Sequence, residues 1–168
     1  MTVYKVDKLM SEARRLARDY RSAMGKPLAG ISAELAVHDA IRLLDLRPAP
    51  AGTVGYDALG QGRWDGKRIQ IKGRAIFDEG RGGQRIGQLK TEQDWDSVVL
   101  VLMDEAYEPF EIYEAERDEV MAAVAESAGS KRSRRGALSV AKFKIISRLV
   151  WTRENGIEDE IWDNQGRA

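Results

Sequence analysis

The segment from Val54 to Lys72 limits the possible folds most strongly, because it joins two short strand-like stretches through a glycine-rich turn. It reads Val54-Gly55-Tyr56-Asp57, then a connection with Gly60, Gly62 and Gly66, then Arg68-Ile69-Gln70-Ile71-Lys72. Apolar and polar residues alternate in the second stretch, which is the period of a half-buried β-strand. The segment therefore predicts a hairpin that brings Asp57, Gln70 and Lys72 to one edge.

This group of residues has a possible chemical use. An acid beside a lysine, with a backbone carbonyl between them, is what a divalent cation and a phosphodiester require. The alternative is structural: Asp57 is also an ordinary turn residue, and Gln70 and Lys72 also suit the solvent-facing side of a strand. The residues of the hairpin are compatible with both a catalytic and a purely structural interpretation.

Composition narrows the class of protein and the kind of metal site. The chain has 168 residues, of which 43% are hydrophobic, and this is sufficient for one domain with its own core. It has no cysteine, so a metal site would have to use oxygen ligands, and a reducing compartment is expected. No apolar run approaches 18 residues and no signal-peptide pattern is present, so a cytoplasmic protein without a membrane segment is expected.

Charge is unevenly distributed although the net charge is zero. Residues 60–90 contain eight Lys and Arg against three acids, and residues 127–153 contain eight against none. Between them, residues 91–126 contain twelve acids and one Arg. Such asymmetry indicates a molecule with one phosphate-facing side, or else solvated faces whose charges cancel.

Two helices are expected before the hairpin. Apolar residues recur at spacings of three and four over residues 7–24, with Asp7 as the expected N-cap. A second helix is expected over residues 31–46, with Ser32 as its cap and Glu34 in its first turn.

A central strand is expected after the hairpin. Residues 97–103, SVVLVLM, form the most apolar run and are too short for a buried helix, which favours a buried strand. The strand that begins at Arg68 is expected to reach Phe77. The other expected elements are a mobile basic loop over 78–87, helical turns over 91–95, an edge strand over 110–113, a helix over 114–125, a flexible basic linker over 127–136 and a helix over 139–149 capped by Ser139.

The order of these elements predicts a mixed α/β fold with a small central β-sheet flanked by helices. We expect one domain over residues 1–153, with its N-terminal helix, and an acidic, peripheral C-terminal tail over residues 154–168.

Three features resemble the PD-(D/E)xK nuclease superfamily: Glu34 on a helix, Gly55-Tyr56-Asp57 at a strand end, and Gln70-Ile71-Lys72 on the next strand. The similarity is to the variant in Mrr-like restriction enzymes and Holliday-junction resolvases, and it covers residues 31–113. Two departures are that no proline precedes Asp57 and that Gln70 replaces the usual acid. The resemblance implies a restriction endonuclease-like core and a Mg²⁺-dependent DNA endonuclease.

The resemblance also implies a role for each residue. Asp57 would bind Mg²⁺ or Mn²⁺ together with the Ile71 carbonyl, and Gln70 would contribute its amide oxygen directly or through water. Glu34 would hold the metal or its water. Lys72 would orient the attacking water or stabilise the charge that develops on the phosphate.

The sequence also suggests which residues contact DNA, and it allows an alternative function without catalysis. Binding of the phosphate backbone is expected from Arg74, Arg81, Arg85, Lys131, Arg132, Arg134 and Arg135. A homodimer would allow both strands of a duplex to be cut. The alternative function is a module that keeps the nuclease fold, binds nucleic acid or a protein, and has lost catalysis; Gln70 is the best argument for it.

Overall fold

The computed structural model describes residues 2–78, 84–127 and 138–163, and for 159–163 it describes the backbone alone. The helices are α1 (Val3–Met24), α2 (Ile31–Leu43), α3 (Arg117–Glu126) and α4 (Val140–Ile146), with a short 3-10 helix, η1 (Gly62–Trp64). The strands are β1 (Arg47–Pro48), β2 (Ala58–Leu59), β3 (Arg68–Ala75), β4 (Ser97–Met103), β5 (Pro109–Glu116), β6 (Arg148–Thr152) and β7 (Gly156–Asp163).

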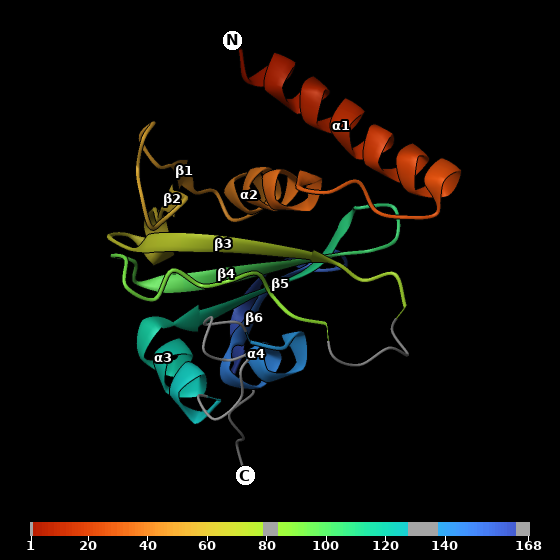
Figure 1. The fold of residues 1–168 in the computed structure, drawn as a ribbon. Helices are drawn as coiled ribbons and strands as arrows, with labels where there is room; N and C mark the ends of the chain where they lie inside the picture. Colours follow the sequence, from red (N-terminus) through yellow and green to blue (C-terminus); the bar gives the residue numbers. More distant parts are fainter. Residues whose placement is uncertain (1, 79–83, 128–137, 164–168) are drawn as a thin grey trace.

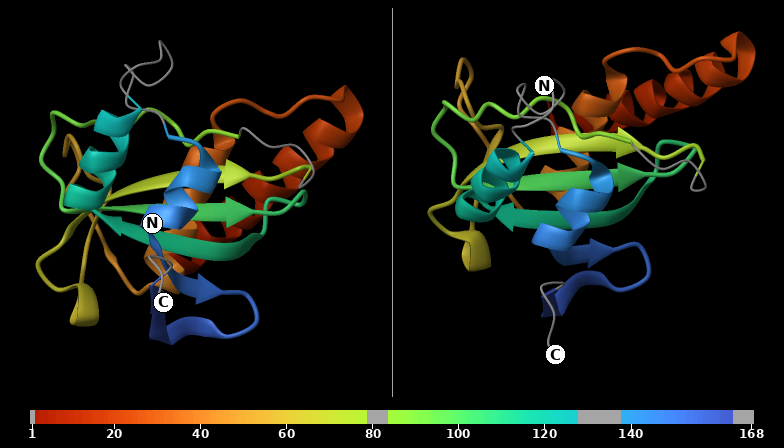
Figure 2. Two further views of the ribbon diagram at one scale, coloured as in Figure 1. Left: turned by 90° about the horizontal axis from the view of Figure 1, so that it is seen from below. Right: turned by 60° about the horizontal axis from the view of Figure 1, so that its bottom comes forward.

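All seven strands form one curled sheet in the order of the sequence, β1 to β7. β3 and β4 are parallel, and every other neighbouring pair is antiparallel. Helices cover both faces: α2 lies on one face with α1 outside it, and α3 and α4 lie on the other (Figure 1; Figure 2). The predicted mixed α/β class, with a mixed sheet flanked by helices, is confirmed.

Alternation along the strands divides the core into two clusters. In β3 and β4, Ile69, Ile71, Val99 and Val101 pack on the α2 side. Val98, Leu100 and Leu102 pack on the other side, against α3, α4 and the connection from β3 to β4. β4 is buried along its whole length, as predicted, because both of its faces are covered.

The connection between β3 and β4 returns across the sheet to make the two strands parallel. It contributes Ile86, Leu89 and Trp95 to the cluster that contains α3 and α4. This segment, residues 84–96 in its described part, therefore lies on the face of β3 opposite α2. The prediction of helical turns over 91–95 is wrong: residues 91–92 form a turn, 93 is a bend, and 94–95 have no regular structure.

Helix α2 lies very close to β3 where the strand carries Gly73. A Cβ atom on Gly73 would collide with the Cβ of Ala36 and would lie 3.0 Å from the Ser32 carbonyl oxygen. Glycine is therefore the residue that lets the helix backbone approach the strand at this point.

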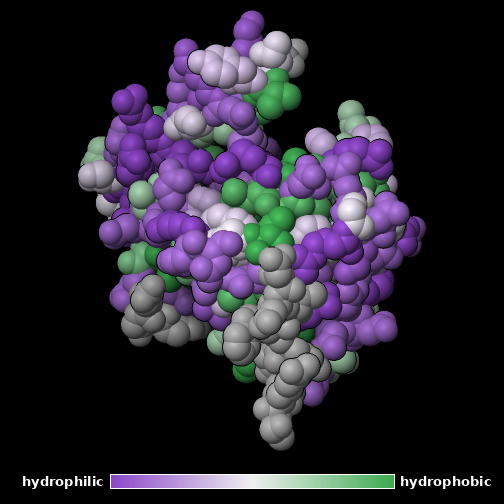
Figure 3. Space-filling view, turned by 180° about the vertical axis from the view of Figure 1, so that it is seen from behind, coloured by the Kyte–Doolittle hydropathy of each residue, from purple (hydrophilic) through white to green (hydrophobic). Residues whose placement is uncertain are grey.

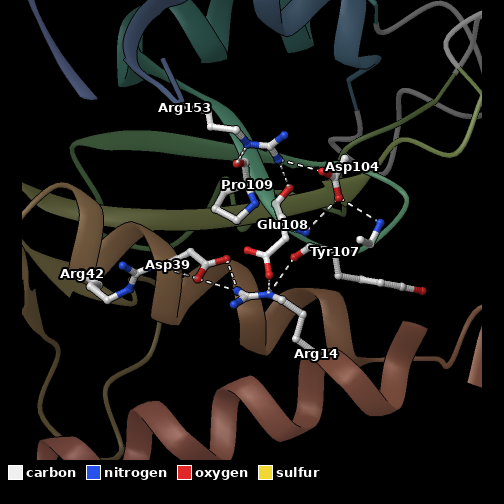
Figure 4. A network of polar contacts seen from close by, with 9 residues as sticks. Arg14, Asp39, Arg42, Asp104, Tyr107, Glu108, Pro109 and Arg153 are labelled. Atoms are coloured by element: carbon white, nitrogen blue, oxygen red, sulfur yellow. Dashed lines mark hydrogen bonds and ion pairs between the residues drawn. The ribbon is translucent and has the colours of Figure 1, made fainter. Parts of the chain in front are cut away.

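Helix α1 is attached to the rest of the molecule by a buried ion pair (Figure 4). Arg14 lies on α1, and its Nη2 is 2.6 Å from each carboxylate oxygen of Asp39 on α2. Arg14 Nε donates to the Tyr107 carbonyl in the β4–β5 turn at 2.9 Å. One arginine thus links two helices and a turn, while Leu9 and Leu16 of α1 remain about half exposed.

The structure corrects the predicted helix starts and ends. α1 starts at Val3, where Thr2 accepts a hydrogen bond from the Lys5 N–H, so Asp7 is not its N-cap. α2 starts after Gly30 without a side-chain cap, so Ser32 is not a cap, and it ends at Leu43. The chain then continues into β1 at the edge of the sheet. Proline suits this position, because Pro48 has no backbone N–H that would need a partner.

Three strands differ from their predicted limits. β3 ends at Ala75 and does not reach Phe77. Strand pairing in the hairpin begins at Ala58, after Asp57, and the stretch over 54–57 is irregular. β5 is longer than predicted and lies between β4 and β6, so it is not an edge strand. Glu114 belongs to this strand rather than to α3, because its buried carboxylate accepts bonds from Trp64, Ser97 and Arg148.

The C-terminal part contains a hairpin that was not predicted. Ser139 caps α4 as predicted by accepting from the Lys142 N–H, but α4 ends at Ile146. β6 follows, and β7 lies within the residues expected to be an acidic tail. Residues 78 and 84–87 of the predicted basic loop have no helix or strand, and the linker over 128–136 lies outside the described residues.

The surface seen from behind carries hydrophobic residues mainly near its middle, with hydrophilic residues over most of the rest (Figure 3). Within the described ranges, no helix is both long enough and apolar enough to cross a membrane.

Candidate active site

The candidate site lies where β2 separates from β3, on the face of the sheet opposite α2. The regular pairing ends at Ala58, opposite Ile69, and the Asp57 N–H donates to the Ile69 carbonyl, so Asp57 lies against β3 without a regular strand partner. Gln70 and Lys72 share one face because side chains alternate along β3. The Asp57 carboxylate is close enough to Lys72 to act on its pKa. The structure therefore brings together the three residues that the hairpin predicted.

Asp57 is held firmly by its backbone and its side chain. Its N–H donates to the Ile69 carbonyl at 2.8 Å, and its carbonyl accepts from the Ala49 N–H at 3.0 Å. One carboxylate oxygen, Oδ2, accepts from the Ile71 N–H at 2.8 Å. The carboxylate therefore lies against the backbone of β3, just before β2 begins.

The backbone of Ile71 offers a second oxygen beside this carboxylate. In a strand the N–H and C=O of one residue point to the same side, and the Ile71 N–H points to Asp57. The Ile71 carbonyl is therefore directed to the same edge, where β2 has already ended. Asp57 Oδ1 has no hydrogen-bond partner within the described residues.

Lys72 is half-buried beneath the connection between β3 and β4. A Cβ atom on Gly87 of that connection would lie 3.9 Å from Lys72 Cδ and Nζ. Burial lowers the pKa of Lys72 below its usual value, Asp57 opposes this effect, and the nearby Lys90 ammonium adds to it. Among the described residues, no hydrogen bond or ion pair holds the ammonium group, so it can interact with an anionic ligand.

Gln70 differs from the expectation for a metal ligand, because its amide is already bonded at both ends. Its side chain is buried, with the residue 2% exposed. Nε2 donates to the Gly55 carbonyl at 3.0 Å, and Oε1 accepts from the Lys90 N–H at 3.3 Å. The amide oxygen therefore faces a backbone donor.

Glu34 is not brought to Asp57. Ala36 faces β3, and a residue two positions earlier lies about 200° around the helix, so Glu34 points away from the sheet. It is exposed. His38, one turn later, lies 3.4 Å from Asp7 and therefore faces α1.

Of the residues expected to contact DNA, two are described. Arg74 is exposed near the end of β3, and alternation places it on the same face as Lys72. Arg85 pairs through its backbone with Ser139, next to α4. The remaining residues, Arg81, Lys131, Arg132, Arg134 and Arg135, lie outside the described residues.

Lys90 is a site residue that sequence reasoning missed. It is exposed, its N–H binds Gln70, and its carbonyl accepts from Trp95 Nε1 at 2.7 Å. No periodic pattern marks it, because it lies in an irregular segment twenty residues from Gln70. The only signal was the positive charge of residues 60–90.

The arrangement has the donor set of a sparsely coordinated divalent cation. Asp57 and the Ile71 carbonyl would supply hard oxygen ligands, and Lys72 would supply a cation for an anionic ligand. Across the described residues, no three His, Asp or Glu side chains group to hold a metal ion. A cation at this edge would therefore depend on water and on oxygen atoms of a substrate to complete its coordination.

Comparisons with known proteins add no family. No protein-family model matches the chain, and no curated protein matches it.

Proposed function

We propose that this chain is a Mg²⁺-dependent endonuclease that hydrolyses phosphodiester bonds of DNA, with a restriction endonuclease-like core. One observation carries the proposal: the Asp57 carboxylate, the Ile71 backbone and the Lys72 ammonium meet at one edge of β3. The parallel pair β3 and β4 behind that edge supplies a rigid, buried support.

The ligand set suits Mg²⁺ better than a cation that needs an all-protein site. Mg²⁺ commonly keeps several waters and binds through one or two carboxylates plus substrate phosphates. Asp57 Oδ1 and the Ile71 carbonyl would be its protein ligands, and a DNA phosphate would complete the site. Mg²⁺ or Mn²⁺, when bound, supplies charge neutralisation and a lower pKa for an attacking water.

The residues of the chain contribute position and charge. Asp57 is fixed by three hydrogen bonds, two from its backbone and one from its side chain, so its carboxylate does not need to reorganise when a ligand binds. Lys72 is half-buried beside it, where a positive charge acts more strongly on a phosphate than it would in water. We assign to Lys72 the stabilisation of charge that develops on the phosphate.

DNA is the proposed partner because exposed basic residues continue from the site. Arg74 follows Lys72 on the same face, and Lys90 lies on the adjacent connection. The basic cluster at 131–135 is an additional proposed phosphate contact. Cleavage of both strands would require two sites, which favours a homodimer.

Two observations favour a second candidate function, a nuclease-fold module that binds nucleic acid or protein without catalysis. Gln70 uses its amide oxygen internally, and Glu34 points away from the sheet, so Asp57 alone of the proposed side-chain ligands faces the site. Cleavage of supercoiled plasmid by the parent with Mg²⁺, abolished by EDTA, supports the enzyme. Salt-dependent DNA binding without cleavage supports the module.

Asp57→Asn is expected to weaken Mg²⁺ binding by about tenfold or more without unfolding the protein, because a ligand loses its charge. The asparagine carbonyl can still accept from the Ile71 N–H, so the hairpin is retained. Isothermal titration with Mg²⁺ and with Mn²⁺ measures the change. Asp65→Asn, at an exposed position in the connection between β2 and β3, is the matched control. Equal affinity in Asp57→Asn and the parent would remove Asp57 from the metal site.

Arg74→Gln is expected to weaken DNA binding and to reduce the slope of log affinity against log salt by about 0.9, the effect of one lost phosphate contact. The measurement is fluorescence anisotropy with a labelled duplex at several salt concentrations, in the Asp57→Asn background to prevent cleavage. Arg15→Gln is the control, since Arg15 is exposed on α1, beyond the opposite face of the sheet. An unchanged slope in Arg74→Gln contradicts the contact.

A further inference from the structure

Gln70 joins the two segments that border the candidate site. Gly55, which accepts from Gln70 Nε2, lies two residues before Asp57. Lys90, whose N–H binds Gln70 Oε1, carries an ammonium group close enough to lower the pKa of Lys72. One buried side chain on β3 therefore reaches the chain before Asp57 on one side and the chain above Lys72 on the other.

The chemistry of these two bonds requires an amide. The side chain at position 70 has to donate to the Gly55 carbonyl and to accept from the Lys90 N–H. A neutral amide supplies both, whereas an ionised carboxylate supplies acceptors alone. A glutamate at this position would place a buried negative charge against the Gly55 carbonyl oxygen, which is unfavourable.

The neighbouring contacts leave little freedom for this connection. The Lys90 carbonyl accepts from Trp95 Nε1, and Trp95 is 1% exposed. Gly55 has a φ of 101°, and a Cβ there would lie 2.7 Å from Gln93 Cβ, so the segment before Asp57 is packed against the same connection. Gln70 is the polar link between these two packed segments.

We propose that Gln70 is a positioning residue that holds Asp57 and Lys90 on either side of Lys72, and that it is not a metal ligand. This inference rests on the proposed function insofar as it concerns Mg²⁺. The positioning role reverses the effect that Gln70→Glu is expected to have on Mg²⁺ affinity. If Gln70 bound the cation, Gln70→Glu would add a charge to the site and tighten binding; as a positioning residue, it must lose affinity.

The pH dependence of Gln70→Glu separates positioning from a loss of packing. A protonated glutamic acid has one O–H donor and one carbonyl acceptor, so it can restore both bonds. Burial raises the pKa of a carboxyl group, so this recovery is expected as the pH is lowered. Gln70→Met keeps a similar volume and cannot form either bond at any pH.

The experiment is a Mg²⁺ titration of the parent, Gln70→Glu and Gln70→Met at pH 8 and pH 6, with hydrogen exchange of the Lys90 amide measured in the same samples. Gln88→Glu, at an exposed position of the same connection, is the control for added charge. We expect Gln70→Glu to bind Mg²⁺ at least about tenfold more weakly at pH 8 and to recover most of the affinity at pH 6. Gln70→Met should be weakened equally at both.

Two results of the Mg²⁺ titration would contradict the inference. Tighter Mg²⁺ binding by Gln70→Glu, or Mg²⁺ binding by Gln70→Met equal to that of the parent, overturns the positioning role. The exchange measurement is independent of the metal: the Lys90 amide should exchange faster in Gln70→Met, relative to its intrinsic rate, even if the parent binds no Mg²⁺ at all. Unchanged protection of that amide overturns the inference, whereas absence of Mg²⁺ binding in the parent with faster exchange rejects the proposed function alone.

Discussion

Replacing Lys72 by methionine is expected to lower Mg²⁺-dependent DNA cleavage by about 100-fold or more and, at neutral pH, to raise the melting temperature. The loss of activity follows from removing a positive charge placed beside Asp57. The gain in stability follows from the low pKa of Lys72, which means that the folded state disfavours its charged form. Methionine keeps the aliphatic stem and removes the charge.

The direction of the stability effect depends on pH. Because the folded pKa lies below the ordinary value of 10.5, the cost of burying the charge is present at neutral pH. Between the two pKa values the unfolded chain binds more protons, so the stability of the parent rises with pH. The melting-temperature difference between Lys72→Met and the parent should therefore shrink as pH approaches 10.5.

Plasmid nicking and thermal unfolding followed by circular dichroism between pH 7 and pH 10 measure the two effects. Lys26→Met, at an exposed position between α1 and α2, controls for removal of a surface charge and should change neither. Nicking at the parental rate by Lys72→Met would exclude Lys72 from catalysis. A lower melting temperature would mean that the ammonium group has a stabilising partner.

Asp39→Ala is expected to destabilise the protein by about 3–5 kcal/mol, because it leaves the Arg14 guanidinium buried without its carboxylate. Arg14 is 8% exposed and Asp39 is 0% exposed, so water cannot readily replace the lost partner. Arg42 and Glu108 are each 3.8 Å from one member of the pair, farther than the 2.6 Å between Arg14 and Asp39. In a chain of this size the loss corresponds to a fall in melting temperature on the order of 10 °C.

A double-mutant cycle separates the pair from its surroundings. Arg14→Met with Asp39→Leu removes both charges and should be less destabilising than Asp39→Ala alone. Urea unfolding of the parent, Arg14→Met, Asp39→Leu and the double variant gives the four free energies of the cycle. Cleavage by folded Asp39→Ala well below its midpoint should stay near the parental rate, because α2 covers the face opposite Lys72. Additive free energies would show that the two charges do not interact.

The local sequence pattern was sufficient to predict a strand that is buried on both faces and a helix that starts at a side-chain cap. β4 matches its prediction because an uninterrupted apolar run fits a strand covered on both faces. Ser139 caps α4 as predicted, because its side chain accepts from a backbone N–H within the first turn of the helix. The convergence of Asp57, Gln70 and Lys72 was also predictable, since it follows from hairpin pairing and from a period of two.

Residues whose roles depend on distant partners were not predictable in this way. Glu114 resembles the first turn of an acidic helix, and it is a strand residue because Trp64, Lys67, Ser97 and Arg148 reach its carboxylate. β7 resembles an acidic tail, and it forms because β6 offers it backbone donors and acceptors. The free energy of each comes from contacts that sequence spacing does not encode.

The sequence alone determined which residues share the edge of β3, because strand alternation and hairpin pairing are local. The tertiary structure decided what each of them can do. Gln70 is a bridge because the connection between β3 and β4 brings the Lys90 N–H to its amide oxygen. Glu34 points away from the sheet because Gly73 and Ala36 set the rotation of α2 about its axis. Lys72 has a lowered pKa because the same connection removes water from it, and burial of this kind is a property of the packed molecule.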